Sequence, residues 1–193
     1  MTDTKPAGPV RLVAGAELPA SGRWQIDPGH TEAAFIGRHF MLTKVRGRFT
    51  GVTGTIVVAD EPGESTVEVT IDMASVESGS QARDDHLRSA DFFDTARHPT
   101  AAFSGRAAHW QGTQGLLAGD LTIRGITRPV TLQVGYLGHV ADPWGGQRAI
   151  FTAHGILNRE DWGLTWNMLL DGGGLLVSKD IGIEIEAEAV LQS

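Results

Sequence analysis

The sequence contains no cysteine, and this absence excludes several kinds of chemistry at once. Without thiols the chain has no disulfide, no thiolate nucleophile and no cysteine-based zinc site. The sequence also lacks any run of the roughly 18 to 20 apolar residues that a membrane-spanning helix needs. Its N-terminal residues form no continuous apolar segment of the kind found in a secretory signal. We therefore expect a cytoplasmic protein without a stable membrane span.

Positive charge is scarce, because 16 Lys and Arg residues stand against 23 Asp and Glu residues and the net charge is −7. Domains that bind nucleic acid usually present a basic face, so this balance argues against nucleic acid as a partner. It also disfavours attraction to anionic membrane surfaces. The acidic balance mainly supports solubility.

Motifs for common catalytic and phosphate sites are missing as well. The sequence has no H-E-x-x-H, no Walker loop, no G-x-G-x-x-G and no G-x-S-x-G. Its seven histidines are scattered, without the spacing of a metal site. We therefore expect no catalytic residue, no metal and no dedicated cofactor.

The length of 193 residues indicates one domain. Residues 1–20 are rich in Pro, Gly and Ala, and we expect them to form a flexible N-terminal tail with at most a short edge strand at 10–13. Residues 21–193 are expected to form a single domain.

Apolar and polar residues alternate along most of this domain. Val67, Val69, Ile71 and Met73 alternate with polar residues, and the same period occurs at 121–123, 130–136 and 181–189. This period is typical of strands with one apolar face. Segments 45–59 and 181–191 are each expected to be strands longer than about ten residues. Such strands close into a barrel or stack as a sandwich, and the glycines within them favour an eight-stranded antiparallel barrel.

One short helical insertion, near residues 80–93, interrupts the strands. Ser78 and Gln81 have the spacing of a capping box, and Asp84 and Arg88 have that of a helical ion pair. A catalytic group of Asp84, Asp85 and His86 is disfavoured, because consecutive helical residues diverge by about 100°. We interpret the insertion as an ion-paired structural helix whose Leu87 points inward.

Large apolar side chains gather near this helix in the sequence and near the expected strand ends. They indicate either a packed core or the wall of a cavity for an apolar ligand. The residues expected to face such a ligand are Phe35, Phe49, Val69, Ile71, Leu87, Phe92, Phe103, Leu121, Ile123, Trp166 and Met168.

Motifs along the chain resemble those of the YceI-like family. They are W-Q-I-D-P-G-H (24–30) and V-R-G-R-F (45–49), R-D-D-H-L (83–87) with A-D-F-F-D (90–94), G-D-L-T-I-R-G-I-T-R-P-V (119–130) and N-R-E-D-W-G (158–163). They occur in the family's order from about Trp24 to Val190.

The resemblance implies an extended, lipocalin-like antiparallel barrel that binds a long apolar lipid of the polyisoprenoid, isoprenoid quinone or fatty amide class. It also implies a non-catalytic carrier or store, whose only cofactor-like molecule would be a bound isoprenoid lipid, and it allows a homodimer. Within this reading His39 or Asn167 would orient a polar head group near the cavity mouth.

Two other functions stay open from the sequence. One is an enzyme that acts on a barrel-bound lipid, with His86 or a nearby carboxylate as acid or base. It requires His86 to reach the cavity and meet an acidic partner. The other is a protein-interaction domain with a filled core, which requires an interior without a void.

Overall fold

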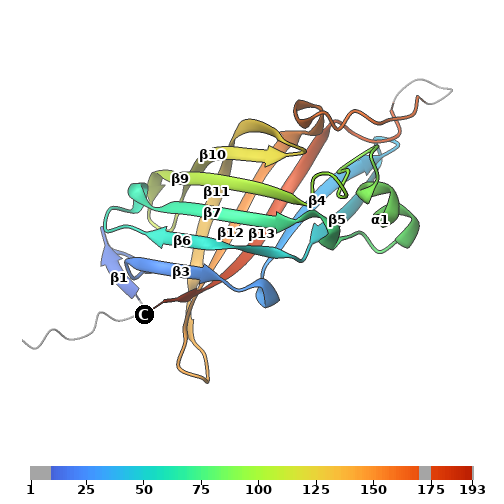
Figure 1. The fold of residues 1–193 in the computed structure, drawn as a ribbon. Coiled ribbons are helices and arrows are strands. Elements are labelled where there is room, and N and C mark those ends of the chain that lie inside the picture. Colours follow the sequence, from blue (N-terminus) through green and yellow to red (C-terminus); the bar gives the residue numbers. More distant parts are fainter. Residues whose placement is uncertain (1–9, 170–174, 193) are drawn as a thin grey trace, which may run out of the picture.

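The computed structural model describes residues 10–169 and 175–192, and its strands close into an antiparallel barrel (Figure 1). The barrel strands pair in the order β12–β11–β10–β9–β7–β6–β3–β13, and β13 pairs with β12 to close the ring. They are β3 (Gly22–Ile26), β6 (Val52–Val58), β7 (Thr66–Asp72), β9 (Thr100–Gln111), β10 (Gln114–Ile123), β11 (Ile126–Ala141), β12 (Gln147–Asn158) and β13 (Asp180–Leu191). The predicted all-β class and eight-stranded antiparallel barrel are confirmed.

One edge of strand β13 pairs with β12, and its other edge pairs with two different strands. It pairs with β4 (Glu32–His39) over residues 182–186 and with β3 over residues 189–191. Strand β4 continues the sheet to β5 (Thr43–Phe49) and β8 (Val76–Glu77). This branch lengthens the wall at the end of the barrel that carries α1 (Figure 1).

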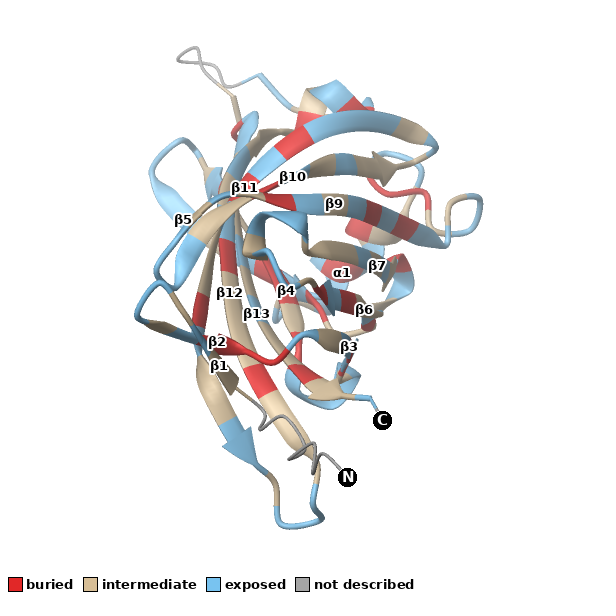
Figure 2. Ribbon diagram, turned by 90° about the vertical axis from the view of Figure 1, so that its left-hand side faces the viewer, coloured by how far each residue is buried: buried red, intermediate tan, exposed pale blue. Residues whose placement is uncertain are grey.

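The strands form where the alternation is regular. Along β9 the side chains of Ala101, Phe103 and Ala107 are buried, whereas their neighbours are more exposed. Figure 2 shows this as alternating bands of buried and exposed residues. The expected long strand at 181–191 is present as β13, but the expected single strand over 45–59 is wrong. The chain turns at Gly51, where a Cβ would lie 2.8 Å from the Cβ of Asp72, and continues as a separate strand.

The N-terminal segment is more ordered than its composition suggests. Residues 1–9 lie outside the described part of the chain, whereas β1 (Val10–Val13) and β2 (Ala16–Pro19) form a hairpin. Leu18 is 3 % exposed and packs in the same cluster as Trp24. The short strand expected at 10–13 is present as β1. The prediction of a loose tail is wrong for residues 14–20, because the core accepts Leu18, a side chain that local composition could not assign to it.

The helical insertion is confirmed, but α1 spans only Gln81–Arg88 and turns follow it to residue 97. The predicted capping box is wrong, because Ser80 is the N-cap residue and makes no side-chain cap. Ser78 instead donates its hydroxyl to the carboxylate of Asp84. The part of the chain that the structure describes also contains short 3-10 helices, namely η1 (Pro28–His30), η2 (Pro62–Glu64), η3 (Met73–Ser75) and η4 (Arg159–Trp162).

The side chain of Arg88 attaches α1 to the segment that contains η3 and β8. Arg88 donates from Nε to the carbonyl of Ala74 at 3.0 Å and from Nη2 to that of Val76 at 2.6 Å. Its ion pair is with Asp85 at 3.4 Å, and the expected pair with Asp84 is not formed because Asp84 is buried. The structural interpretation of the helix charges agrees with these contacts.

The buried apolar residues form three clusters inside the barrel. One lies beside α1 and contains Phe49, Phe92 and Phe93, and another surrounds Trp24. The third contains Phe103 and Trp162. Within residues 10–169 and 175–192, no helix has both the length and the apolar composition needed to cross a bilayer.

Candidate functional site

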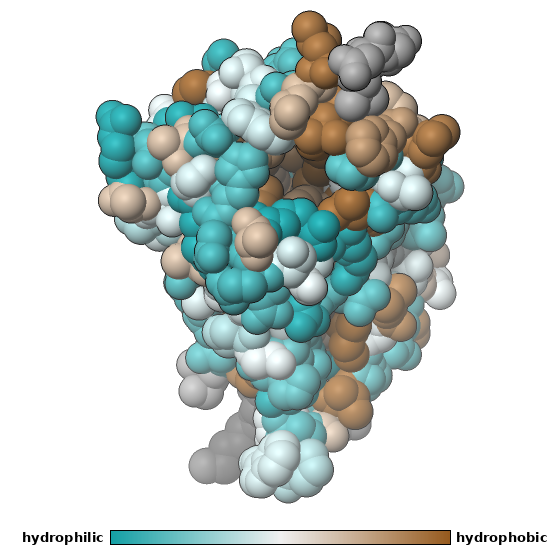
Figure 3. Space-filling model, turned by 90° about the vertical axis from the view of Figure 1, so that its right-hand side faces the viewer, coloured by the Kyte–Doolittle hydropathy of each residue, from teal (hydrophilic) through white to brown (hydrophobic). Residues whose placement is uncertain are grey.

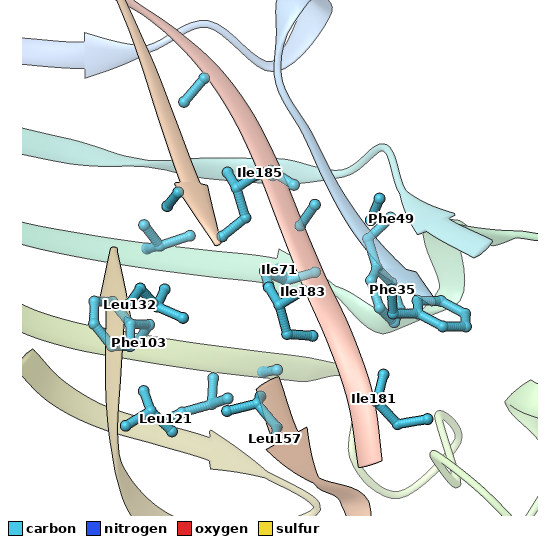
Figure 4. Close-up of a pocket in the computed structure, with 18 of the residues that line it drawn as sticks. Phe35, Phe49, Ile71, Phe103, Leu121, Leu132, Leu157, Ile181, Ile183 and Ile185 are labelled. Atoms are coloured by element: carbon cyan, nitrogen blue, oxygen red, sulfur yellow. The ribbon is translucent and has the colours of Figure 1, made fainter. Parts of the chain in front are cut away.

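The barrel contains a long apolar cavity with a volume of about 510 Å³. Seen from the α1 end, the surface is hollowed, with hydrophobic atoms inside and hydrophilic atoms along much of the rim (Figure 3). Figure 4 shows side chains from many strands pointing into the same space, among them Phe35, Phe103 and Ile183. The interior of the barrel is therefore not filled. The alternative of a protein-interaction domain required an interior without a void, and the structure does not meet that requirement.

Ten of the eleven predicted ligand-facing residues line this cavity. They are Phe35, Phe49, Val69, Ile71, Leu87, Phe92, Phe103, Leu121, Ile123 and Trp166. For those on the strands β7 and β10, the alternation with polar residues indicated the inward face. Whether they contact a ligand stays a prediction.

The expected inward position of Met168 is wrong, because its side chain is 55 % exposed and does not line the cavity. Both residues were chosen for their large apolar side chains, and residues 163–168 form no regular strand, so apolar character alone did not decide which side chain points inward. The backbone N–H of Met168 instead donates to Asn167 Oδ1 at 3.0 Å, which turns the chain locally.

Glycines provide room for two of the lining aromatic rings. The ring of Phe35 lies against Gly47 of the paired strand, at the position that a Cβ would occupy. The ring of Phe103 lies over Gly105 and Gly119 in the same way, 2.5 Å and 2.8 Å from their ideal Cβ positions. A side chain at any of these glycines would displace a ring of the cavity wall.

The turn after α1 brings aromatic rings to the cavity mouth. The ring centroid of His86 lies 4.5 Å from that of Trp166 and 5.0 Å from that of Phe92, both edge to face. His86 Nε2 also lies 2.9 Å from Asp91 Oδ2. His86 lines the cavity, so the two geometric conditions of the enzymatic alternative are met.

The ionisable residues that line the cavity are all basic. They are Arg11, Arg38, His39, Arg83, His86 and Arg159, and no described carboxylate lines the cavity with them. Sequence reasoning missed the four arginines. Arg159 was within a quoted motif at 158–163, but nothing in the motif shows that the side chain turns inward.

The two residues expected to orient a head group have different positions. His39 lines the cavity and packs against Phe40 in a tilted arrangement, with ring centroids 4.0 Å apart. Asn167 bridges the backbone of Val177, donating from Nδ2 at 2.8 Å and accepting at Oδ1 from the N–H at 3.1 Å. Asn167 does not line the cavity, so the expectation that it orients a head group there is wrong.

The motif at residues 24–30 contributes to structural stability through Asp27, away from the cavity mouth. Arg148 Nη1 lies 2.5 Å from Asp27 Oδ2 and 3.0 Å from Glu188 Oε1, and its Nε lies 3.1 Å from Asp142 Oδ2. The hydrogen bond from Arg148, followed by that from His30, lowers the pKa of Asp27 from 3.8 to about 2. The same carboxylate caps η1 by accepting from Gly29 N.

The described ranges contain no group of three or more His, Asp or Glu side chains placed to hold a metal ion. This finding covers residues 10–169 and 175–192 only.

Comparison with known proteins gives consistent matches. The YceI-like domain profile matches residues 24–189. Protein YceI of Escherichia coli O157:H7 is 34 % identical over 180 residues, covering 93 % of this chain and 91 % of that protein.

Solved structures show the same fold. The YceI protein of Campylobacter jejuni is 27 % identical, with a TM-score of 0.69 over 81 % of this chain and 90 % of that one. A polyisoprenoid binding domain from Saccharophagus degradans is 16 % identical, with a TM-score of 0.65 over 88 % of this chain and 98 % of that one.

Proposed function

We propose that this chain, which belongs to the YceI-like family, binds and carries a long apolar lipid inside its barrel without transforming it. The observation that carries this proposal is the elongated cavity of about 510 Å³, whose walls are mostly aliphatic and aromatic side chains. Such a cavity suits a flexible apolar chain, because each strand contributes its inward-facing residues to one continuous wall.

The hydrophobic effect alone supplies enough free energy for this function. Burying one methylene group is worth about 0.8 kcal/mol. A chain of about ten to fifteen carbons therefore gains roughly 8 to 12 kcal/mol before the costs of association and ordering are subtracted. Convergent polar groups along the whole tunnel are not needed.

The proposed ligand class is a polyisoprenoid, an isoprenoid quinone or a fatty amide. The Saccharophagus degradans domain provides one polyisoprenoid-binding precedent for this fold. A homodimer and a cytoplasmic location stay predictions.

The test is extraction of the purified protein with organic solvent, followed by mass spectrometry of the extract. We expect a co-purifying lipid, and we expect protein stripped of lipid to take up an added prenyl quinone. A heat-unfolded sample serves as the control for unspecific uptake. Protein that repeatedly contains no lipid and takes up no prenyl quinone would contradict the proposal.

Catalysis on the bound lipid is a second candidate, and the His86–Asp91 pair at 2.9 Å is the observation that favours it. The pair lies at the mouth, where the side chains of His86 and Asp91 are 37 % and 53 % exposed. The edge-to-face contacts of His86 with Phe92 and Trp166 also give the ring a packing role. Incubation with a prenyl ester and analysis for a released alcohol distinguishes the two functions.

A further inference from the structure

Exposed apolar side chains gather beside the cavity mouth. In the described part of the chain eleven large apolar residues are exposed, and five of them lie on two neighbouring segments, the turn between β4 and β5 and the segment after η4. Single exposed apolar residues are normal on a protein surface, whereas a contiguous group indicates an interaction site. These five residues, which we call the apolar lip, are 48 % to 83 % exposed, and they are Phe40, Met41, Leu42, Met168 and Leu169.

Backbone hydrogen bonds hold the two segments of the apolar lip together at the mouth. The N–H of Phe40 donates to the carbonyl of Leu176 at 2.9 Å, and the N–H of Leu176 donates to the carbonyl of Met168 at 3.0 Å. Leu176 itself lines the cavity, as does His39 beside Phe40. Figure 3 shows hydrophobic atoms on one side of the hollow and hydrophilic atoms on the other. The apolar lip is therefore continuous with the mouth.

The turn between β4 and β5 has a backbone conformation that its residues do not favour. Phe40 and Met41 have φ values of +52° and +60°, in the left-handed region that asparagine and glycine enter at lower cost. The turns after β1 and β10 also have two successive residues with positive φ, but the second residue is Gly15 or Gly125. The β4–β5 turn therefore exposes two large apolar side chains in place of less strained residues, which indicates a function for these side chains.

The charge beside the apolar lip differs in sign from that of the whole chain. The net charge is −7, yet segments 37–46 and 163–169 contain Arg38, Lys44 and Arg46 and no Asp or Glu. Arg38 and Lys44 are exposed, whereas Arg46 forms ion pairs with carboxylates on β4 and β13. Apolar side chains flanked by cations are typical of surfaces that bind the interface of a bilayer, where the cations meet lipid phosphates.

A bilayer also suits the cargo that we propose for the barrel. A long apolar lipid resides in a membrane, and its transfer through water would expose the whole chain to solvent. A barrel whose mouth rests on the bilayer takes up such a chain without that exposure. A second copy of the chain seated on the apolar lip would instead obstruct the mouth.

We propose that the apolar lip docks the barrel, mouth first, onto a bilayer that contains anionic phospholipid. The two segments enter the boundary between head groups and acyl chains, and Arg38 and Lys44 lie at the level of the phosphates. The excess of carboxylates lies on the rest of the chain, and its repulsion from the bilayer favours this orientation. This inference rests on the proposed lipid binding and adds the surface through which the lipid is exchanged.

The first experiment measures co-sedimentation of the full chain with vesicles of phosphatidylcholine, alone or mixed with phosphatidylglycerol. We expect the wild type to bind the mixed vesicles. Phe40→Asn combined with Met41→Gly should weaken binding by about tenfold or more, because it removes two apolar side chains from the contact. Asparagine and glycine favour this turn, so the variant should stay folded, which thermal denaturation followed by circular dichroism verifies. Leu42→Ser, which leaves both turn residues in place, should weaken binding by about threefold or more.

Trp144→Ser is the matched control. Trp144 is 86 % exposed and lies in the turn between β11 and β12, which projects away from α1 (Figure 1). It does not line the cavity. We expect this variant to bind the vesicles as the wild type does.

The second experiment uses the absence of cysteine to place one fluorophore at a chosen position. Leu42→Cys and, separately, Trp144→Cys are labelled with a dye whose emission shifts to the blue in an apolar environment. We expect mixed vesicles to shift the emission at position 42 and to leave that at position 144 unchanged. A shift at position 144 alone would place the membrane contact at the other end of the barrel and overturn the inference.

The remaining outcomes separate docking from lipid binding. A wild type that binds neither kind of vesicle but still binds a prenyl quinone added from solvent overturns the inference and leaves lipid binding in place. Binding to vesicles without uptake of the quinone contradicts the proposed lipid binding and leaves the docking surface. Equal weakening in Trp144→Ser and in the turn variant overturns the inference. A dimer in light scattering that becomes a monomer in the turn variant assigns the apolar lip to contact between copies, which also overturns it.

Discussion

The two ends of the barrel use the same residue types for different purposes. At the hairpin end Trp24 is 0 % exposed, and its indole donates to the carbonyl of Ala20 at 3.0 Å. At the α1 end Trp166 is only partly buried and packs against His86 at the mouth. One tryptophan therefore completes a closed core, whereas the other forms part of a wall that faces the cavity.

Arginine shows the same contrast. Arg11 beside the hairpin donates to three backbone carbonyls, whereas Arg159 at the α1 end retains a buried nitrogen without a partner in the described chain. If the barrel carries a lipid as proposed, we expect the hairpin end to contribute mainly to stability and the open α1 end mainly to lipid binding. Four predictions test this division.

The largest effect is expected for Trp24→Ala, compared with Trp166→Ala. Loss of a fully buried tryptophan should lower the free energy of unfolding by about 3 to 5 kcal/mol, because it leaves a cavity in a packed cluster. The Trp166 variant should lose less than about 2 kcal/mol, because its ring is partly exposed already. Urea denaturation measures both values, and equal losses would contradict the proposed division.

A charge in the middle of the tunnel should affect binding more than folding. Phe103→Asp puts a carboxylate into an apolar wall, and we expect it to abolish lipid retention, a loss of roughly a hundredfold or more in affinity, while the barrel stays folded. Lipid content is measured by mass spectrometry of the extract, and Phe103→Leu is the apolar control. Unchanged lipid content in the Asp variant would remove Phe103 from the ligand-binding wall.

The ion network around Arg148 should make stability depend on acid pH. The pKa of Asp27 is about 2 in the folded chain and about 3.9 when unfolded, so its contribution is present above about pH 4 and is lost as the pH falls towards 2. The loss should be roughly 2 kcal/mol. Urea denaturation from about pH 5 to about pH 2 measures it, and Asp27→Asn should show a correspondingly smaller decrease; an identical decrease in that variant would exclude Asp27 as the cause.

The smallest effect is expected for His86→Ala at the mouth. Lipid affinity should fall by only about two- to fivefold, or less than about 1 kcal/mol, because the lost contacts are those of a partly exposed ring. The same protein samples are incubated with a prenyl ester and analysed for product. Product that forms with the wild type and disappears in the variant would favour catalysis over carriage.

Much of the barrel was predictable because strand formation depends on a local pattern. The alternation around Val69 and Ile71 indicated which side chains point inward, and these residues do line the cavity. The expectation for Met168 depended on its apolar character and was wrong, because the chain forms no regular strand after η4 and this side chain is exposed. The local pattern also missed the hairpin, whose Leu18 is buried by contacts with distant segments.

The candidate site likewise has features that the sequence determined and features that only the tertiary structure decided. The sequence by itself determined the all-β class, the inward face of each regular strand and the motifs that mark the family, since these depend on residues close together in the chain. Only the tertiary structure decided which cations enter the cavity. Arg159 becomes part of the cavity wall because barrel closure places its guanidinium between the carbonyls of Leu164 and Ser178. A burial of this kind depends on segments that sequence spacing does not bring together.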